Sequence, residues 1–257
     1  MGYLLNCQFT KGKYRRVATF GKDKALVHYR QLMKLIHVVA SRRVLSSGLL
    51  AALSVIVLSS ACVGGKNPPI SNTPSSGVGC VAPAKVLLQD VDPSDSKGLS
   101  FRKTGSEPVI VYFENVNLSV RLWNELQQAA QIWSRSPCIK AIAVTQCPPS
   151  SNCVHVGQYY PGEGPTGSDL DHDIDGVFMG EERGGWTIGG VIDLNLDLIN
   201  EETTQESLTT IVHEMGHAFG LPHRNTKTDV MGGMTDDNTS PIPDKVDFDN
   251  LRVLYSQ

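Results

Sequence analysis

Three histidines near the C-terminal end of the chain have the spacing of metal ligands. His213 and His217 are four residues apart, so on a helix their imidazoles lie one turn apart on the same face. Gly220 can adopt the left-handed conformation that ends a helix, which lets the chain fold back and present His223 as a third ligand. Three nitrogen ligands with one open position are typical of catalytic zinc. The sequence therefore predicts that these histidines bind Zn²⁺.

Glu214 stands beside the first of these histidines, where its carboxylate can reach a water molecule activated by the metal. A carboxylate in that place can take the proton of the water as a general base. The alternative is an amphipathic helix whose histidines share one face by chance. The pattern H-E-x-x-H-x-x-G-x-x-H specifies five positions in eleven residues, which chance rarely meets, so we prefer the metal site.

The segment before the motif has the features of a helix that could hold the ligands rigidly. Thr203 and Glu206 form a capping-box pattern at its start. Apolar residues then repeat at helical spacing, which predicts one buried face. A helix fixed by that face positions the histidines on the other. The apolar residues are Leu208, Ile211, Val212, Met215 and Phe219.

The rest of the domain reads as strands and one further long helix. The order of these elements predicts an α/β (α+β) domain with a twisted, mostly parallel sheet that is covered by helices. Three aspartates between residues 85 and 99 predict only a solvated loop; they are Asp90, Asp92 and Asp95. We expect strands at 109–113, 139–144, 154–160 and 190–196, and a helix over 118–134.

The histidine motif resembles the zinc signature of the metzincin metallopeptidases. Met231, eight residues after His223, resembles the methionine of the turn beneath the zinc in that clan, and Met234 is the alternative. The spacing is that of the matrixin family, and the tail 247–255 resembles the last helix of matrixin catalytic domains. The resemblance covers a whole catalytic domain from about residue 105 to 257. It departs from the usual matrixin pattern at Arg224 and at the glycine after Met231.

The resemblance implies a zinc-dependent metalloendopeptidase that acts on protein or peptide substrates with Glu214 as general base. An edge strand within about 176–196 could align an extended peptide by strand addition. The competing class is a non-enzymatic, metal-binding surface lipoprotein. A binding module needs the histidines but no general base beside them, so Glu214 favours the enzyme.

Four acidic residues form a candidate calcium loop. Asp171, Asp173, Asp175 and Glu182, with Gly176, fit the pattern D-x-D-x-D-G-x₅-E. In that pattern alternate side chains converge on one hard cation. The segment before it cannot form the first helix of an EF-hand, and the alternative is a solvated acidic loop. The sequence therefore offers Ca²⁺ as a second cofactor.

The first 61 residues have the features of a signal region. They hold ten of the 23 Lys/Arg but one of the 26 Asp/Glu, so the remainder is acidic, which argues against nucleic-acid binding. Arg42 and Arg43 precede an apolar run at 49–58 that is too short to span a bilayer comfortably. Small residues then lead to Cys62. This resembles a bacterial lipoprotein signal with Cys62 as the lipidated residue; an ordinary cleaved signal or an uncleaved anchor helix are alternatives.

These observations predict the organisation of the chain. Residues 1–61 form the signal region, and 1–32 precede a more ordinary start at Met33 and suggest a mis-assigned start codon. Residues 62–84 form a lipid-anchored flexible linker, and 85–257 form the catalytic domain. We expect an exported monomer that a lipid anchor holds at the bacterial cell envelope, on the outer membrane or cell surface, or that is otherwise secreted.

Four cysteines of the exported part suggest disulfide bonds. They allow three pairings, between which the sequence does not choose. For Cys80 there is an alternative, because its surroundings faintly resemble the matrixin cysteine switch, in which a propeptide thiolate occupies the open zinc position. The four are Cys80, Cys138, Cys147 and Cys153.

Overall fold

The structure is a computed structural model of the chain, and it describes residues 5–6, 79–82, 87–95, 98–234 and 239–256. The expected domain boundaries, the start at Met33 and the lipidation site Cys62 lie outside these ranges. Within them, no helix has both the length and the apolar character needed to cross a bilayer.

The strands of the described residues form one six-stranded sheet in the order β1-β5-β6-β4-β2-β3. Strands β3, β2, β4 and β6 run parallel, while β5 pairs antiparallel with β6 and the two-residue β1 pairs antiparallel with β5. The expected mixed, mostly parallel sheet is confirmed. The strands are β1 Leu5–Asn6, β2 Val109–Asn115, β3 Ile139–Val144, β4 Cys153–Tyr159, β5 Gly176–Arg183 and β6 Trp186–Asn195.

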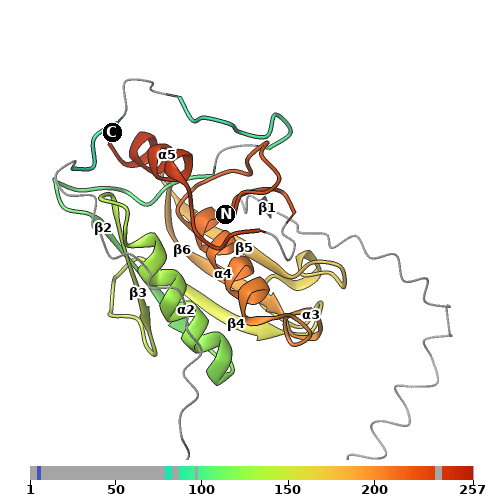
Figure 1. Cartoon of the computed structure of the whole chain (residues 1–257). Coiled ribbons are helices and arrows are strands. Elements are labelled where there is room, and N and C mark those ends of the chain that lie inside the picture. The colour runs from blue at the N-terminus through green and yellow to red at the C-terminus, as the bar shows by residue number, and fades with distance from the viewer. Residues whose placement is uncertain (1–4, 7–78, 83–86, 96–97, 235–238, 257) are drawn as a thin grey trace, which may run out of the picture. The chain divides into compact units, whose positions relative to one another are not determined.

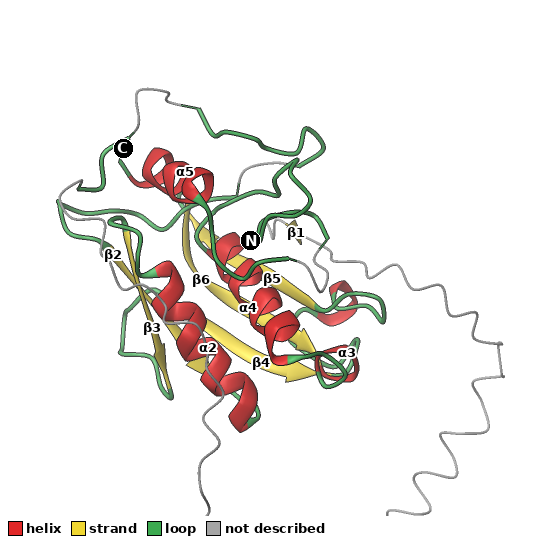
Figure 2. Ribbon diagram, in the orientation of Figure 1, coloured by secondary structure: helices red, strands yellow, loops and turns green. Residues whose placement is uncertain are grey.

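Two long helices lie side by side across one face of this sheet (Figures 1 and 2). They are α2 (Val120–Trp133) and α4 (Thr204–Ala218). The short helix α3 (Leu196–Ile199) follows β6, and α5 (Lys245–Tyr255) ends the domain. A 3₁₀ turn spans Gly167–Asp169.

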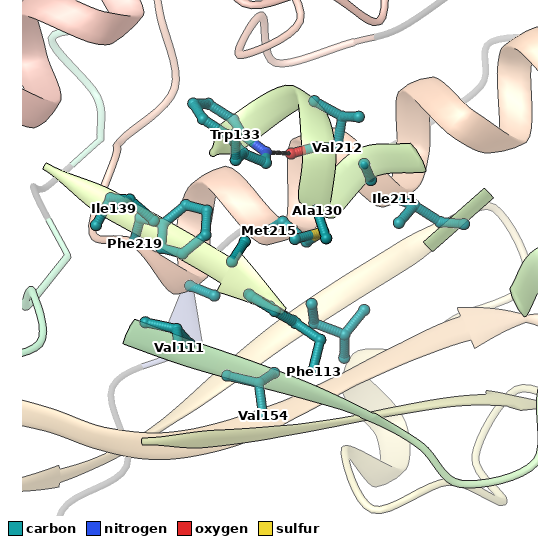
Figure 3. Close-up of a cluster of buried hydrophobic side chains, with 14 of the residues drawn as sticks. Val111, Phe113, Ala130, Trp133, Ile139, Val154, Ile211, Val212, Met215 and Phe219 are labelled. Atoms are coloured by element: carbon teal, nitrogen blue, oxygen red, sulfur yellow. Dashed lines mark hydrogen bonds between the residues drawn. The ribbon is translucent and has the colours of Figure 1, made fainter. Parts of the chain in front are cut away.

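The hydrophobic core lies between this pair of helices and the sheet (Figure 3). The indole Nε1–H of Trp133 donates to the Val212 carbonyl at 2.9 Å, which joins the end of α2 to the middle of α4. The ring of Phe219 meets Phe113 and Trp133 edge to face, with centroids 5.6 and 5.5 Å apart. Because these contacts fix α4 on the sheet, the histidines that it carries have a rigid support.

The segment 176–195 differs in part from the sequence interpretation, which expected a strand at 190–196, an edge strand within about 176–196 and a calcium loop ending at Glu182. It forms a hairpin of β5 and β6, closed by Gly184 and Gly185 with φ values of 61° and 81°. Two residues with positive φ are what a tight hairpin of the type I′ class requires, so the Gly-Gly pair was a usable signal.

The cysteines form two disulfides, Cys80–Cys138 and Cys147–Cys153. The cysteine-switch interpretation of Cys80 is therefore wrong, because its sulfur is bonded to the buried Cys138 before β3. The bond ties residues 79–82 to the core. Two disulfides favour an oxidising compartment, as expected of an exported protein.

Candidate metal centre

Helix α4 begins and ends with local features that the sequence encodes. The Thr203 hydroxyl accepts from the Glu206 N–H at 3.3 Å, and the Glu206 carboxylate accepts from the Thr203 N–H at 2.8 Å. After the helix, Gly220 has a φ of 91°, and a Cβ there would lie 3.1 Å from the Leu99 carbonyl oxygen. Only glycine suits both the left-handed conformation and this close approach. The chain can then turn back toward α4 at His223.

The three histidines converge on one point. His213 and His217 are buried on α4, and their Nε2 atoms lie 2.7 Å apart. One ring nitrogen from each of these residues and from His223 can be chosen so that all three lie within 4.8 Å of one another. The structure therefore brings together the three residues that the sequence proposed as zinc ligands.

Hydrogen bonds fix which ring nitrogens face this point. His213 Nδ1 lies 2.5 Å from the Val230 carbonyl oxygen, and His217 Nδ1 lies 2.8 Å from the Leu221 carbonyl oxygen. A carbonyl can only accept, so each Nδ1 carries the hydrogen and each Nε2 presents a lone pair.

Two lone pairs that face each other at this distance need a cation between them. A proton is a poor candidate, since burial and the neighbouring His217 lower the pKa of His213, and burial, then His223, lower the pKa of His217 to about 3. Neutral imidazole nitrogens are good ligands for zinc. The residues present thus fit a Zn²⁺ ion held by His213, His217 and His223.

The side chain of Glu214, a residue of α4, lies against the start of β5. It is fully buried, and a Cβ on Gly176 would come within 3.1 Å of its Cγ. Burial raises the pKa of this carboxyl well above its usual range, and the charge of Asp175 adds to the rise, while the Phe178 N–H opposes it. A divalent cation at the histidines would also oppose it by favouring the carboxylate. Glu214 thus follows the first histidine of the group in the sequence of α4, and it packs against the start of strand β5.

Met231 lies in a tight turn beneath α4. The Gly232 N–H donates to the Asp229 carbonyl at 2.9 Å, and the Met231 N–H donates to the Asp229 side chain at 3.0 Å. Met231 is fully buried, whereas the alternative, Met234, is 45% exposed. The same turn supplies the Val230 carbonyl that orients His213, a contribution that the sequence interpretation missed because no side chain signals it.

A methyl group added at Gly216 should disturb this packing. Its Cβ would lie 2.3 Å from Met231 Sδ and 3.0 Å from Trp133 Cζ2, so Gly216→Ala should lower the free energy of unfolding by about 1–3 kcal/mol. Denaturant unfolding of the metal-free protein measures this loss. In combination with Met231→Ala, which vacates the contested space, the loss should be smaller than the sum of the single losses. Additive losses would argue against the contact.

The candidate calcium ligands are not brought together. Asp171 and Asp173 lie exposed on the surface, Asp175 is fully buried, and Glu182 belongs to β5 near its hairpin turn. Where the chain is described, none of them belongs to a group of side chains close enough to share a metal ion. The structure gives no support to Ca²⁺ at this loop, because Asp175 is buried just before β5 and Glu182 lies within β5.

The aspartates of the segment 87–95 are also placed differently from the solvated loop that we expected. Asp95 contacts His223, with its Oδ2 3.2 Å from the ring Nδ1. Asp90 forms an ion pair with the buried Arg224, at 3.0 Å from Nε. Asp92 is the member that fits the expectation, since its carboxylate caps the exposed turn at Ser94.

Comparisons with known proteins add no argument about the class of this chain. No protein-family model matches the chain, and no curated protein matches it. A solved structure described as "Structure of myroilysin" is similar over 58% of this chain and 93% of that chain, at 13% identity with a TM-score of 0.34. A likeness this distant carries no functional argument. What the chain itself shows is a domain with a mostly parallel sheet and a three-histidine group at α4, of which His213 and His217 are buried.

Proposed function

We propose that this protein is a zinc-dependent endopeptidase of the metzincin clan. One observation carries the proposal: three histidine nitrogens converge on one point, and the residue after the first of these histidines is a buried glutamate, Glu214, that is not one of the converging groups. Three nitrogen ligands leave zinc an open position for chemistry. The spacing from His223 to Met231 supports the finer assignment to matrixin-like enzymes.

Each residue of the site then has a role in peptide hydrolysis. Zinc, when bound, would lower the pKa of a water molecule and polarise the substrate carbonyl. Glu214 accepts the proton of the attacking water at its carboxylate and passes it to the leaving amine. Burial excludes bulk solvent from Glu214, so this proton is transferred within the site. Met231 supports the helix from below and touches no substrate.

Strand β5, which lies next to the two-residue edge strand β1, supports an extended peptide as the substrate. Its first residues lie against Glu214, as the close approach of Gly176 and the Phe178 N–H shows. On its other side β5 pairs antiparallel with the segment Leu5–Asn6, with Leu5 opposite Met179. This edge can therefore receive an extended chain by strand addition, next to the carboxylate that would act on it.

A protease assay on the purified chain tests the function. We expect cleavage of an unfolded protein substrate with zinc bound, loss of cleavage with a chelator, and recovery when zinc is restored. Stoichiometric zinc without cleavage would favour the alternative, a non-enzymatic metal-binding surface lipoprotein.

We also propose that the enzyme is an exported monomer with a lipid anchor at Cys62. The motivation is the apolar run at 49–58 followed by small residues and a cysteine. A fatty-acid probe should label the wild-type protein in cells and leave Cys62→Ser unlabelled. Unlabelled wild type, or a mature protein that still contains residues before 62, would contradict this prediction.

A further inference from the structure

The segment before the first strand of the core lies along the third histidine. Val91 forms an antiparallel bridge with Arg224, and the Asp92 N–H donates to the His223 carbonyl at 2.9 Å. These contacts join residues separated by more than 130 positions in the sequence. The backbone of His223 is thus held by the segment 87–95, in addition to its own loop.

The start of this segment is fixed to the last helix. The Gln89 N–H donates to Asn250 Oδ1 at 2.8 Å, and Asn250 Nδ2 donates to the Gln89 carbonyl at 3.0 Å. Asn250 is buried on α5, so its side of this pair of hydrogen bonds is shielded from water. The segment therefore has a defined path where it reaches the histidines.

Asp95 of this segment contacts both the backbone and the ring of His223. Its Oδ2 accepts from the His223 N–H at 2.7 Å and lies 3.2 Å from His223 Nδ1. Both side chains are largely buried, at 15% and 12% exposure. His223 thereby differs from His213 and His217, whose Nδ1 atoms bond to backbone carbonyls. Its ring is oriented by a carboxylate from a distant part of the chain.

We propose that Asp95 is a positioning residue that orients His223 and strengthens the binding of zinc. The inference rests on the proposed metal site and deepens it. A carboxylate that accepts from Nδ1–H fixes the ring so that Nε2 faces the metal, and its negative charge makes that nitrogen a stronger electron donor. The segment 87–95 is then part of the metal centre, although the family resemblance begins only near residue 105.

Asp95→Asn in the full chain tests this role, because asparagine keeps an acceptor of the same size and removes the charge. The zinc affinity of the metal-free protein is measured by competition with a chromophoric chelator. We expect the variant to bind zinc about 10–100-fold more weakly than the wild type. Asp92→Asn is the graded control: it removes a charge from the same segment, but its carboxylate bonds to Ser94 and not to the His223 ring, so its loss of zinc affinity should be much smaller than that of Asp95→Asn.

A second readout separates positioning from simple loosening of the segment. The visible spectrum of the Co²⁺-substituted protein reports the geometry of the ligands, and it should change in Asp95→Asn and not in Asp92→Asn. The denaturation midpoints of the metal-free variants should stay close to the wild type, which shows that the segment remains folded.

The outcomes distinguish this inference from the proposed function. If Asp95→Asn binds zinc as tightly as the wild type, or if Asp92→Asn loses as much affinity, the positioning role is overturned. Wild-type protein that binds zinc but cleaves nothing would contradict the proposed peptidase function and leave the role of Asp95 intact. Wild-type protein that binds no zinc would overturn both.

Discussion

Glu214→Ala should lower peptide hydrolysis by about 10²–10⁴-fold while zinc stays bound. In the proposed mechanism the carboxylate moves a proton, and the three histidines converge without it. Its removal also takes a fully buried acid out of the interior, so the variant should be at least as stable as the wild type. The measurements are kcat/KM on a peptide substrate, the zinc content of the purified variant and its denaturation midpoint.

Two further variants control this experiment. Glu214→Gln has nearly the same shape but cannot accept the proton, so its activity should fall as far as that of Glu214→Ala. His217→Ala should lose both zinc and activity, because it removes a ligand. A folded Glu214→Ala protein that is purified without zinc would show that Glu214 is a ligand and would refute its assignment as the base.

Helix α4 was predictable because its determinants are local. The capping box at Thr203 and Glu206, the apolar face and Gly220 all lie within eighteen residues, and each acts on its immediate neighbours. The strands β2, β3 and β4 were also predicted to within one or two residues, because each is a short apolar run between turn signals.

The contacts around His223 were not predictable by the same reasoning. Three aspartates in 87–95 look like a solvated loop until their partners are known, and the partners of Asp90 and Asp95 lie 134 and 128 residues away. The disulfide pairing could not be predicted for the same reason, since nothing local marks Cys80 as the partner of Cys138. The calcium pattern finds no support for a different reason: Asp175 matches the motif but is fully buried just before β5.

Arg224 follows the third histidine and departs from the usual matrixin residue, and the structure shows what it contacts. Its side chain is 6% exposed, and Nη1 lies 2.6 Å from Asp229, 2.9 Å from Asp244 and 3.3 Å from Asp247. Its backbone N–H donates to the Met231 carbonyl at 2.7 Å. The guanidinium therefore joins the methionine turn to the start of α5, and its ion pair with Asp90 adds the segment 87–95.

The pKa values of the carboxylates around Arg224 depend on its positive charge. Asp229 and Asp247 are almost fully buried. Burial, with the charge of Asp229 next in effect, raises the pKa of Asp247 to about 8, while Arg224 opposes the rise. Because the folded state holds this proton more tightly than the unfolded state, Asp247 destabilises the fold as pH rises from the unfolded value of 3.8 through about 8. Without Arg224 the folded-state pKa would rise further, and this destabilisation would grow.

Arg224→Leu should therefore lower the free energy of unfolding by about 3–5 kcal/mol at pH 8, because it leaves buried carboxylates without their cation. The loss should shrink as pH falls and should be smallest below about 3.8, where the unfolded chain also takes up the protons. Chelator-treated protein unfolded by denaturant at several pH values measures this. Arg252→Leu is the comparison variant: Arg252 is 17% exposed, and its partner Asp249, at 2.7 Å, keeps a second cation in Lys245, so its loss should be smaller and should depend less on pH. Adding Asp247→Asn to Arg224→Leu should recover part of the stability at pH 8. A loss that does not vary with pH would show that Arg224 acts through packing and not through charge.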